Sequence, residues 1–488
     1  CDDTHAVNLF FEGIKTPSIR RLSNNWKLYL IVPSILLSAL WILILRILKL
    51  SFNNSRKLFE REVISSNEVA LFFHNHCQIC FALNFGRLCS LQNAIISFKL
   101  SSRISFLLLI TVCKDILLLC MRFLTADYLY PLHIGPLEEG VLQISDEGEV
   151  VAIFKNRDSF LQEKLEVFKG ILCPGFVNAH CHLELSHLKG FIRQSAGLLS
   201  FILAMQKRND FSQKEITIAI DYAEKQMIEN GIVAVGDICN TSHTICQKKK
   251  RNLQYYNFIE VFGVKDEEVS QIINDAKNLR DKFRDIGLKS TISPHSAYSV
   301  PKNLMHRVAD VFDEKDTLIS IHMQEALAEN SLFENKEGLF LNWLKSINAS
   351  SEIWQKRDKS IDVLIELGYK RKLLVHNTFS KKDQIGSNYY CTCPKSNLYI
   401  ENALPDYSIF DPNKLCVGTD SLASNNSFSI LDELQIIKEN SDFDLNTLLK
   451  IASKNGAEAL GFDNLGTFEE GKKPGVNLIS QLSSVEIM

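Results

Sequence analysis

Eight short apolar runs, separated by longer amphipathic stretches, follow one another between residues 171 and 420 of this 488-residue chain. The runs are Ile171–His182, Gly231–Asp237, Tyr256–Val261, Leu288–Pro294, Thr317–His322, Leu373–His376, Tyr389–Cys393 and Leu415–Asp420. The stretches between them include Ile216–Ile228, in which apolar residues recur at helical spacing. A closed parallel barrel needs eight strands that alternate with helices in this way. The sequence therefore predicts an α/β protein with a (β/α)8 TIM barrel over residues 175–462.

The segments on either side of this region have a different pattern. Residues 122–157 alternate apolar and polar side chains, as in Glu149–Phe154, and glycine-rich turns separate the alternating stretches. Near the C-terminus, Leu465–Lys473 has the composition of turns between short strands. We expect residues 121–174 and 463–488 to combine into one small, β-sandwich-like domain.

Residues 1–120 differ from the rest of the chain in composition. They contain no methionine, only two glycines and six of the thirteen cysteines. The segment Leu28–Leu45 is an 18-residue run without a charged side chain, flanked by Lys27 and Arg46, and it reaches the lower limit for a membrane span. The lack of methionine favours another explanation, that residues 1–120 are upstream DNA translated ahead of a true start at Met121. We take this explanation as the prediction. A membrane anchor remains the second hypothesis.

Composition narrows the class of protein. A hydrophobic content of 46% and a charged content of 23% are ordinary for a soluble enzyme. The net charge of −3 and the absence of a basic stripe predict no nucleic-acid partner. Thirteen cysteines in so long a chain indicate free thiols in a reducing compartment rather than a disulfide framework. We expect a cytoplasmic protein, or one anchored through residues 28–45 under the second hypothesis.

Metal-ligand side chains stand at the ends of four of the predicted strands. His180 and His182 end the first, and the fifth, sixth and eighth end in His322, His376 and Asp420. Alternation places the first two imidazoles on one face, about 6 to 7 Å apart along the strand. Loops at the carboxyl ends of barrel strands form the open mouth, so all five side chains are expected to converge there. Imidazole and carboxylate suit zinc, iron or manganese, and we predict one divalent metal ion.

A second His-x-His triplet provides a comparison. His74 and His76, followed by Cys77 and Cys80, lie in the N-terminal stretch without a surrounding strand pattern. With 12 histidines in 488 residues, chance alone gives roughly 0.3 such triplets, so spacing by itself proves little. We expect the pair at 180 and 182, and not this one, to bind metal.

Glu325 lies three residues beyond His322, where the strand gives way to its loop. That spacing can place a carboxylate beside a metal without making it a ligand. A metal lowers the pKa of its water to about 7, and attack on carbon then needs a group that takes the water proton and passes it on. Glu325 is the candidate for this proton shuttle, and an ordinary exposed loop glutamate is the alternative.

Taken in order, the motifs resemble those of a known family. They are Pro174–Glu184, Gly231–Asp237, Pro294–Tyr298, His322–Glu325, Val375–Asn377, Cys393–Asn397, Gly418–Asn425 and Gly466–Lys473. This set is similar to the amidohydrolase superfamily. The nearest branch contains chlorohydrolases and the S-adenosylhomocysteine and aminodeoxyfutalosine deaminases. The resemblance covers nearly all of residues 121–488 and none of residues 1–120.

The resemblance implies a catalytic apparatus around one metal ion, usually zinc and sometimes iron. The matching positions make His180, His182, His322 and Asp420 its ligands and Glu325 the proton shuttle, with His376 orienting the hydroxide and Asp420 also accepting a proton. A two-metal variant of the superfamily uses a carboxylated lysine at the end of strand four. That strand here ends in Ser293–His295, without a lysine, which favours a single metal.

The resemblance also implies a small heterocyclic substrate. We expect hydrolytic deamination of an aminated purine nucleoside or related compound. Removal of another ring substituent, as in a chlorohydrolase, and an inactive barrel protein are the alternatives. The candidate substrate contacts are Glu184, His295, Tyr298 and Asn397; for each, a purely local hydrogen bond or cap is the competing interpretation. A homodimer is compatible with the sequence.

Overall fold

The computed structural model describes residues 121–488, apart from residues 159, 161–163, 314, 316–317, 351–352, 354, 482–483 and 488. The candidate span at residues 28–45 and the pair His74 and His76 therefore lie outside the described residues. Within the described part of the chain, no helix is both long enough and apolar enough to cross a membrane.

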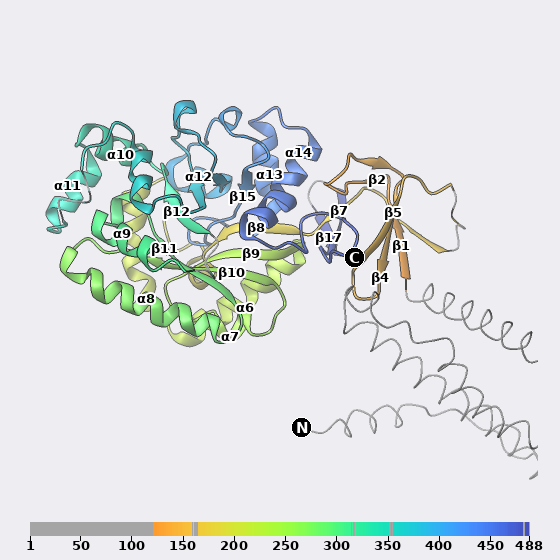
Figure 1. Ribbon diagram of the computed structural model, residues 1–488, viewed down its shortest axis with the longest axis horizontal. Helices are drawn as coiled ribbons and strands as arrows, with labels where there is room; N and C mark the ends of the chain where they lie inside the picture. The colour runs from red at the N-terminus through yellow and green to blue at the C-terminus, as the bar shows by residue number, and fades with distance from the viewer. Residues whose placement is uncertain are drawn as a thin grey trace, which may run out of the picture. The chain divides into compact units, whose positions relative to one another are not determined.

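Eight parallel strands follow the order of the predicted runs. They are β8 (Phe176–Cys181), β9 (Ile232–Cys239), β10 (Gln254–Val261), β11 (Lys289–Pro294), β12 (Ile319–Met323), β13 (Lys372–His376), β14 (Tyr389–Thr392) and β15 (Leu415–Val417). The first four pair in sequence as one sheet, and the last four as another. Parallel bridges join the two sheets at both seams, between Cys181 and Asp420 and between Ser296 and His322. This arrangement is consistent with a TIM barrel (Figure 1).

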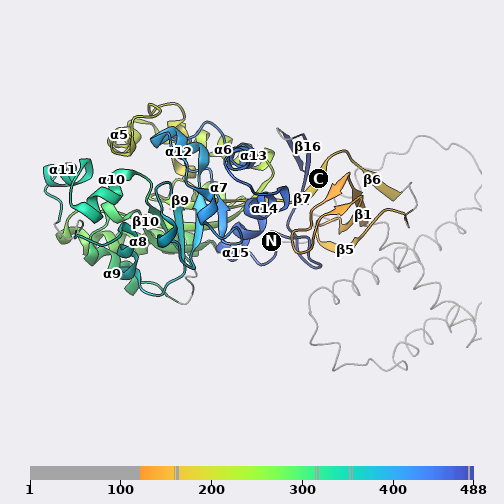
Figure 2. The same cartoon turned by 90° about the horizontal axis from the view of Figure 1, so that it is seen from above.

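Helices separate most of these strands and lie along their outer side (Figures 1 and 2). They are α5 (Leu198–Ala204), α6 (Gln213–Glu229), α7 (Ile245–Lys248), α8 (Val269–Arg284), α9 (Lys302–Asp310), α10 (Leu327–Asn330), α11 (Leu339–Ser346), α12 (Pro394–Glu401), α13 (Ile430–Glu439), α14 (Leu445–Leu449) and α15 (Asn455–Leu460). Helix α6 shows why they form. Ser212 caps it through the backbone N–H of Glu215, and Ile216, Ile220 and Met227 lie buried along one face.

One expected helix is missing from this alternation. Between β13 and β14, in a segment that the structure describes in full, the only helical element is a 3₁₀ turn, Lys382–Gln384. The connecting residues 377–388 are short, mostly polar and broken by Gly386, so they lack an apolar stripe that a helix could bury. Two longer connections compensate by carrying extra elements. The loop after β8 contains a 3₁₀ segment, Leu183–Leu188, and the region after β12 contains another, Ser360–Leu367.

Two further sheets are built from both ends of the described region. One contains β1 (Met121–Thr125), β4 (Val141–Ser145), β5 (Val150–Phe154) and β6 (Leu165–Val167); the other contains β2 (Tyr128–Leu129), β3 (Leu137–Glu138), β7 (Ile171–Pro174), β16 (Val476–Gln481) and β17 (Ser484–Ile487). Leu124 and Leu142 of the first sheet share an apolar cluster with Leu172 and Leu478 of the second. The first predicted run is thus divided at Gly175: β7 pairs with β16, whereas β8 pairs with β9. The domain boundaries drawn from the sequence remain predictions.

Candidate active site

Five predicted side chains meet at the carboxyl ends of the barrel strands. His180 lies on β8 and His182 directly after it, His322 on β12, His376 at the end of β13 and Asp420 after β15, and all five are buried. The Nε2 atoms of His182 and His322 are 3.3 Å apart. Asp420 Oδ1 lies 3.4 Å from Nε2 of His182 and 3.6 Å from Nε2 of His180. Four strands distributed around both sheets therefore aim their last side chains at one point.

Glycine makes the close approach of β15 to β8 feasible. The backbone N–H groups of Thr419 and Asp420 both donate to the carbonyl oxygen of His180, at 3.0 and 3.1 Å. A Cβ on Gly418 would lie 2.7 Å from that oxygen and 2.8 Å from the Cβ of His180. Any larger residue at this position would hold Asp420 away from the histidines.

The donor set fits a divalent metal ion. Neither ring nitrogen of His180 has a hydrogen-bond partner although both are buried. Burial lowers the pKa of His180, lowers that of His182 to about 3 and lowers that of His322 well below its usual range, so the imidazoles are neutral and carry free lone pairs. Burial opposes ionisation of Asp420, yet its contacts with the histidines hold its pKa well below the ordinary value. Neutral imidazoles around a carboxylate are the ligands that zinc binds.

A second group of donor atoms overlaps the first. Glu260, His295 and His322 also bring ligand atoms within 4.8 Å of one another. However, His322 Nδ1 donates a hydrogen bond to the carbonyl oxygen of His295 at 2.8 Å. This leaves only Nε2 of His322 with a free lone pair, and Nε2 faces His182. The geometry therefore favours the group of His180, His182 and His322.

Two serine hydroxyls orient Asp420. Its Oδ2 accepts hydrogen bonds from Ser396 Oγ at 2.6 Å and from Ser424 Oγ at 2.5 Å. These bonds occupy one carboxylate oxygen and turn the other towards the histidines. Sequence reasoning did not single out either serine, although both lie within motifs that carry the family resemblance.

His376 and Glu325 face each other across the same site. His376 Nδ1 donates to Asn397 Oδ1 at 2.8 Å, and its Nε2 lies 3.6 Å from Glu325 Oε1 without a hydrogen-bond partner. Burial, reinforced by the charge of Asp420, raises the pKa of Glu325 well above the usual value. Glu325 is therefore a buried carboxyl whose protonated form is favoured by its surroundings, not the exposed loop residue of the alternative interpretation.

With this geometry in view, the comparison with known proteins is direct. A model described as the amidohydrolase family matches residues 171–485. The chain belongs to this family. Among similar proteins, an adenosine deaminase from Helicobacter pylori is 28% identical over 320 residues, covering 62% of this chain and 77% of that protein. An aminodeoxyfutalosine deaminase from Nitratiruptor is 24% identical over 326 residues, covering 63% and 78%.

Solved structures agree with this amidohydrolase's fold. The Helicobacter pylori aminofutalosine deaminase in complex with methylthio-coformycin has a TM-score of 0.64 at 24% identity, covering 73% of this chain and 91% of that one. An adenosine deaminase from Xanthomonas campestris with bound zinc has a TM-score of 0.59 at 20% identity, covering 74% and 85%. At this level of identity the likeness concerns the fold alone.

The candidate substrate contacts of the amidohydrolase lie around the same mouth. His295 Nδ1 is bound to Ser299 Oγ at 2.7 Å, and the ring of Tyr298 stacks on Phe340 with centroids 4.5 Å apart. The carboxylate of Glu184 accepts bonds from the backbone N–H groups of residues 240 and 241, both at 3.0 Å. Glu184 thus anchors the loop after β9, and Asn397 holds His376. Substrate contact by these four residues stays a prediction.

Two further buried carboxyl groups near the site, Glu260 and Glu329, were not singled out from the sequence. Glu260, near the end of β10, accepts a bond from Asn240 Nδ2 at 3.0 Å and lies 3.6 Å from His322 Nδ1. Glu329 is fully buried, and burial raises its pKa to about 8. Glu260 is the residue before the last in the third apolar run, Tyr256–Val261, so applying the strand-end rule to every strand would have found it. Glu329 lies within α10, where no such rule applies.

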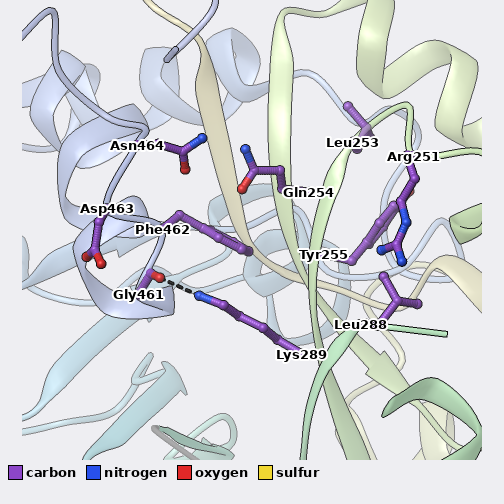
Figure 3. A pocket seen from close by; sticks show the side chains of 11 residues that line it. Arg251, Leu253, Gln254, Tyr255, Leu288, Lys289, Gly461, Phe462, Asp463 and Asn464 are labelled. Atoms are coloured by element: carbon purple, nitrogen blue, oxygen red, sulfur yellow. Dashed lines mark hydrogen bonds between the residues drawn. The ribbon is translucent and has the colours of Figure 1, made fainter. Parts of the chain in front are cut away.

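A separate pocket lies at the opposite, amino-terminal ends of the strands. It has a volume of about 450 Å³ and is lined by residues that include Gln254, the first residue of β10, and Lys289, the first residue of β11 (Figure 3). Its two cationic side chains already bind backbone oxygens. Lys289 Nζ donates to Gly461 O at 2.6 Å, and Arg251 donates to Ile286 O. This pocket is remote from the histidine group, and we assign it no chemistry.

Proposed function

We propose that this amidohydrolase catalyses the hydrolytic deamination of an aminated purine nucleoside or a related heterocycle. The reaction would use one divalent metal ion, for which zinc is our first choice and iron the alternative. One observation carries the proposal: the buried carboxyl of Glu325 lies 3.6 Å from His376 Nε2, beside a histidine group closed by Asp420. His180, His182, His322 and Asp420 would hold the metal. The substrate is a small molecule, and the described residues offer no reason to invoke a nucleic acid.

The residues divide the chemistry among themselves. When bound, the metal would supply Lewis acidity, which lowers the pKa of water to about 7. Asp420, ionised and fixed by two serines, accepts a proton from the attacking water. Glu325 delivers its own proton to the ring nitrogen as the tetrahedral carbon forms. Asp420 then passes the proton taken from water to the amino group, the C–N bond breaks and ammonia leaves, while the proton of the new hydroxyl returns to Glu325. His376 Nε2, turned inward because Nδ1 is bound by Asn397, holds the new hydroxyl in place.

The choice of a purine nucleoside is supported by the named relatives. Adenosine deaminase and aminodeoxyfutalosine deaminase both match this chain over more than three quarters of their own length. Both names describe loss of an amino group from a purine-containing compound. At 28% and 24% identity, these names support a reaction class and leave the exact substrate open.

Ammonia release tests the proposal. The full chain, loaded with zinc, is incubated with a panel of aminopurine nucleosides and with chlorinated heterocycles, and ammonia and chloride are measured. We expect ammonia from at least one nucleoside, and a rate about 10²- to 10⁴-fold lower from Glu325→Gln with the same metal content. Chloride without ammonia would replace deamination by ring dechlorination. Turnover that is unchanged in Glu325→Gln would refute the assigned mechanism.

A further inference from the structure

The turn that carries Glu325 is organised by the residue before it, Gln324. Gln324 lies two residues after His322 and adopts a left-handed backbone conformation with a φ of 50°. It is completely buried. Glutamine has no particular tolerance for this conformation, unlike glycine or asparagine. Something in the surroundings must therefore hold the residue there.

The side-chain amide of Gln324 supplies that hold. Its Oε1 accepts a hydrogen bond from Ser380 Oγ at 2.6 Å. Its Nε2 donates to Gln384 Oε1 at 2.6 Å and to Ser360 Oγ at 2.8 Å. Both N–H groups and one oxygen lone pair of the amide are thus used. These three partners belong to two separate segments, the loop after β13 and the 3₁₀ segment that precedes β13. A fourth and longer bond, of 3.3 Å, joins Nε2 to Asn330 Oδ1 at the end of α10.

The backbone connects the same two turns. The N–H of Phe379 donates to the carbonyl oxygen of Gln324, and the N–H of Asn377 donates to that of Met323, both at 3.0 Å. His376 and Asn377 are themselves left-handed, with φ values of 71° and 53°. The turn that presents Glu325 and the turn that presents His376 are therefore locked to each other, and Gln324 contributes both backbone and side chain to the lock.

We infer that Gln324 is a positioning residue, which fixes the Glu325 carboxylate opposite His376 through its buried amide. The inference rests on the proposed role of Glu325 as the proton carrier. It assigns Gln324 no contact with substrate or metal. A reacting group displaced by about 1 Å loses on the order of 10²-fold in rate, and that loss is the effect we expect when the amide is removed.

Two substitutions in the full chain separate the amide from the backbone conformation. Gln324→Gly relieves the left-handed φ but removes the amide, and Gln324→Leu keeps the size of the side chain. We expect both variants to retain one metal ion per chain and a KM within about threefold of the wild type, with kcat lower by on the order of 10²-fold. The matched control is Gln247→Leu. Gln247, on the outer helix α7, also has a buried side-chain amide, which donates a hydrogen bond to Glu224 of α6 at 2.5 Å. Loss of this amide should leave kcat unchanged.

Crystal structures of the variants give a readout that does not depend on turnover. The separation of Glu325 Oε1 and His376 Nε2, 3.6 Å here, should grow by about 1 Å while the histidine group stays in place. An inactive wild type would refute the proposed function, and this separation would still decide the role of Gln324. If neither variant folds, Ser380→Ala, which removes one bond to the amide, should lower kcat and widen the separation to a smaller degree. Wild-type kcat or an unchanged separation in the folded variants overturns the inference.

Discussion

Substituting Gly418 by alanine is the sharpest perturbation that the site offers. The added methyl group would lie 2.7 Å from the carbonyl oxygen, 2.8 Å from the Cβ and 2.9 Å from the amide nitrogen of His180. Ordinary van der Waals contact begins near 3.4 Å, so the two strands must separate by about 0.7 Å at this point. Two of the three atoms are backbone atoms, which cannot rotate away. Overpacking of this kind costs about 1–3 kcal/mol of folding free energy.

The separation acts directly on the metal ligands. His180 and Asp420 stand on the two strands that must part, and metal–ligand distances tolerate only about 0.2 Å. The backbone bonds from Thr419 and Asp420 to His180 O would lengthen at the same time. We therefore expect Gly418→Ala to fold with a lowered melting temperature and to bind zinc about 10–100-fold more weakly, the range seen when the supports of a metal ligand are lost.

Competition with a chelator, followed by elemental analysis, measures the zinc affinity, and thermal unfolding measures the stability. Gly386→Ala is the matched control. Around a Cβ at that position, the nearest atom is Asn388 Nδ2 at 4.0 Å, so the methyl group meets open space. A Gly418→Ala protein with wild-type zinc affinity and wild-type turnover would refute the claim that close approach of β15 to β8 builds the site.

Three further predictions follow from the same geometry. Glu325→Gln should retain metal and lose about 10² to 10⁴ in turnover, because the amide cannot carry a proton; loss of metal would instead make Glu325 a ligand. His180→Ala should lose metal and activity together, whereas joint replacement of His74 and His76 should change neither. Loss of metal in the His74 and His76 variant, with metal retained in His180→Ala, would contradict the proposed metal site. Burial raises the pKa of Glu329 from 4.5 to about 8, so this residue should contribute a loss of stability on the order of 4 kcal/mol as pH rises from 4.5 to 8. Glu329→Gln should make the pH dependence of unfolding shallower by that contribution.

The sequence could place side chains at one mouth where chemistry and periodicity coincide. His182, His322 and Asp420 each end an apolar run, and the carboxyl ends of barrel strands form the open mouth. The structure brings these side chains together, and their catalytic roles stay predictions. The order of the strands followed from the same pattern. The prediction for the connection between β13 and β14 was wrong, because a helix was expected there and the segment forms only a 3₁₀ turn.

The supports of the site could not be predicted in this way. Ser396 and Ser424 reach Asp420 from positions 24 and 4 residues away, and Gln324 binds Ser380 across 56 residues. A serine or glutamine has no periodicity that reveals such a partner. Ser424 reaches Asp420 through the local turn of one loop, whereas only the fold brings Ser396 to Asp420 and Ser380 to Gln324.

The strained backbone at the ends of the barrel strands is another feature that the sequence does not reveal. Gln324, His376, Asn377 and Asp420 all have positive φ values, between 50° and 71°, and all follow the ends of barrel strands. A left-handed conformation costs about 1–2 kcal/mol for residues other than glycine, so stability alone would favour glycine at these turns. Glycine cannot bind a metal, hold a hydroxyl group or form an amide network. The hydrogen bonds around these residues fix the strained backbone, and the roles that we propose for Asp420, His376 and Gln324 need side chains that glycine lacks.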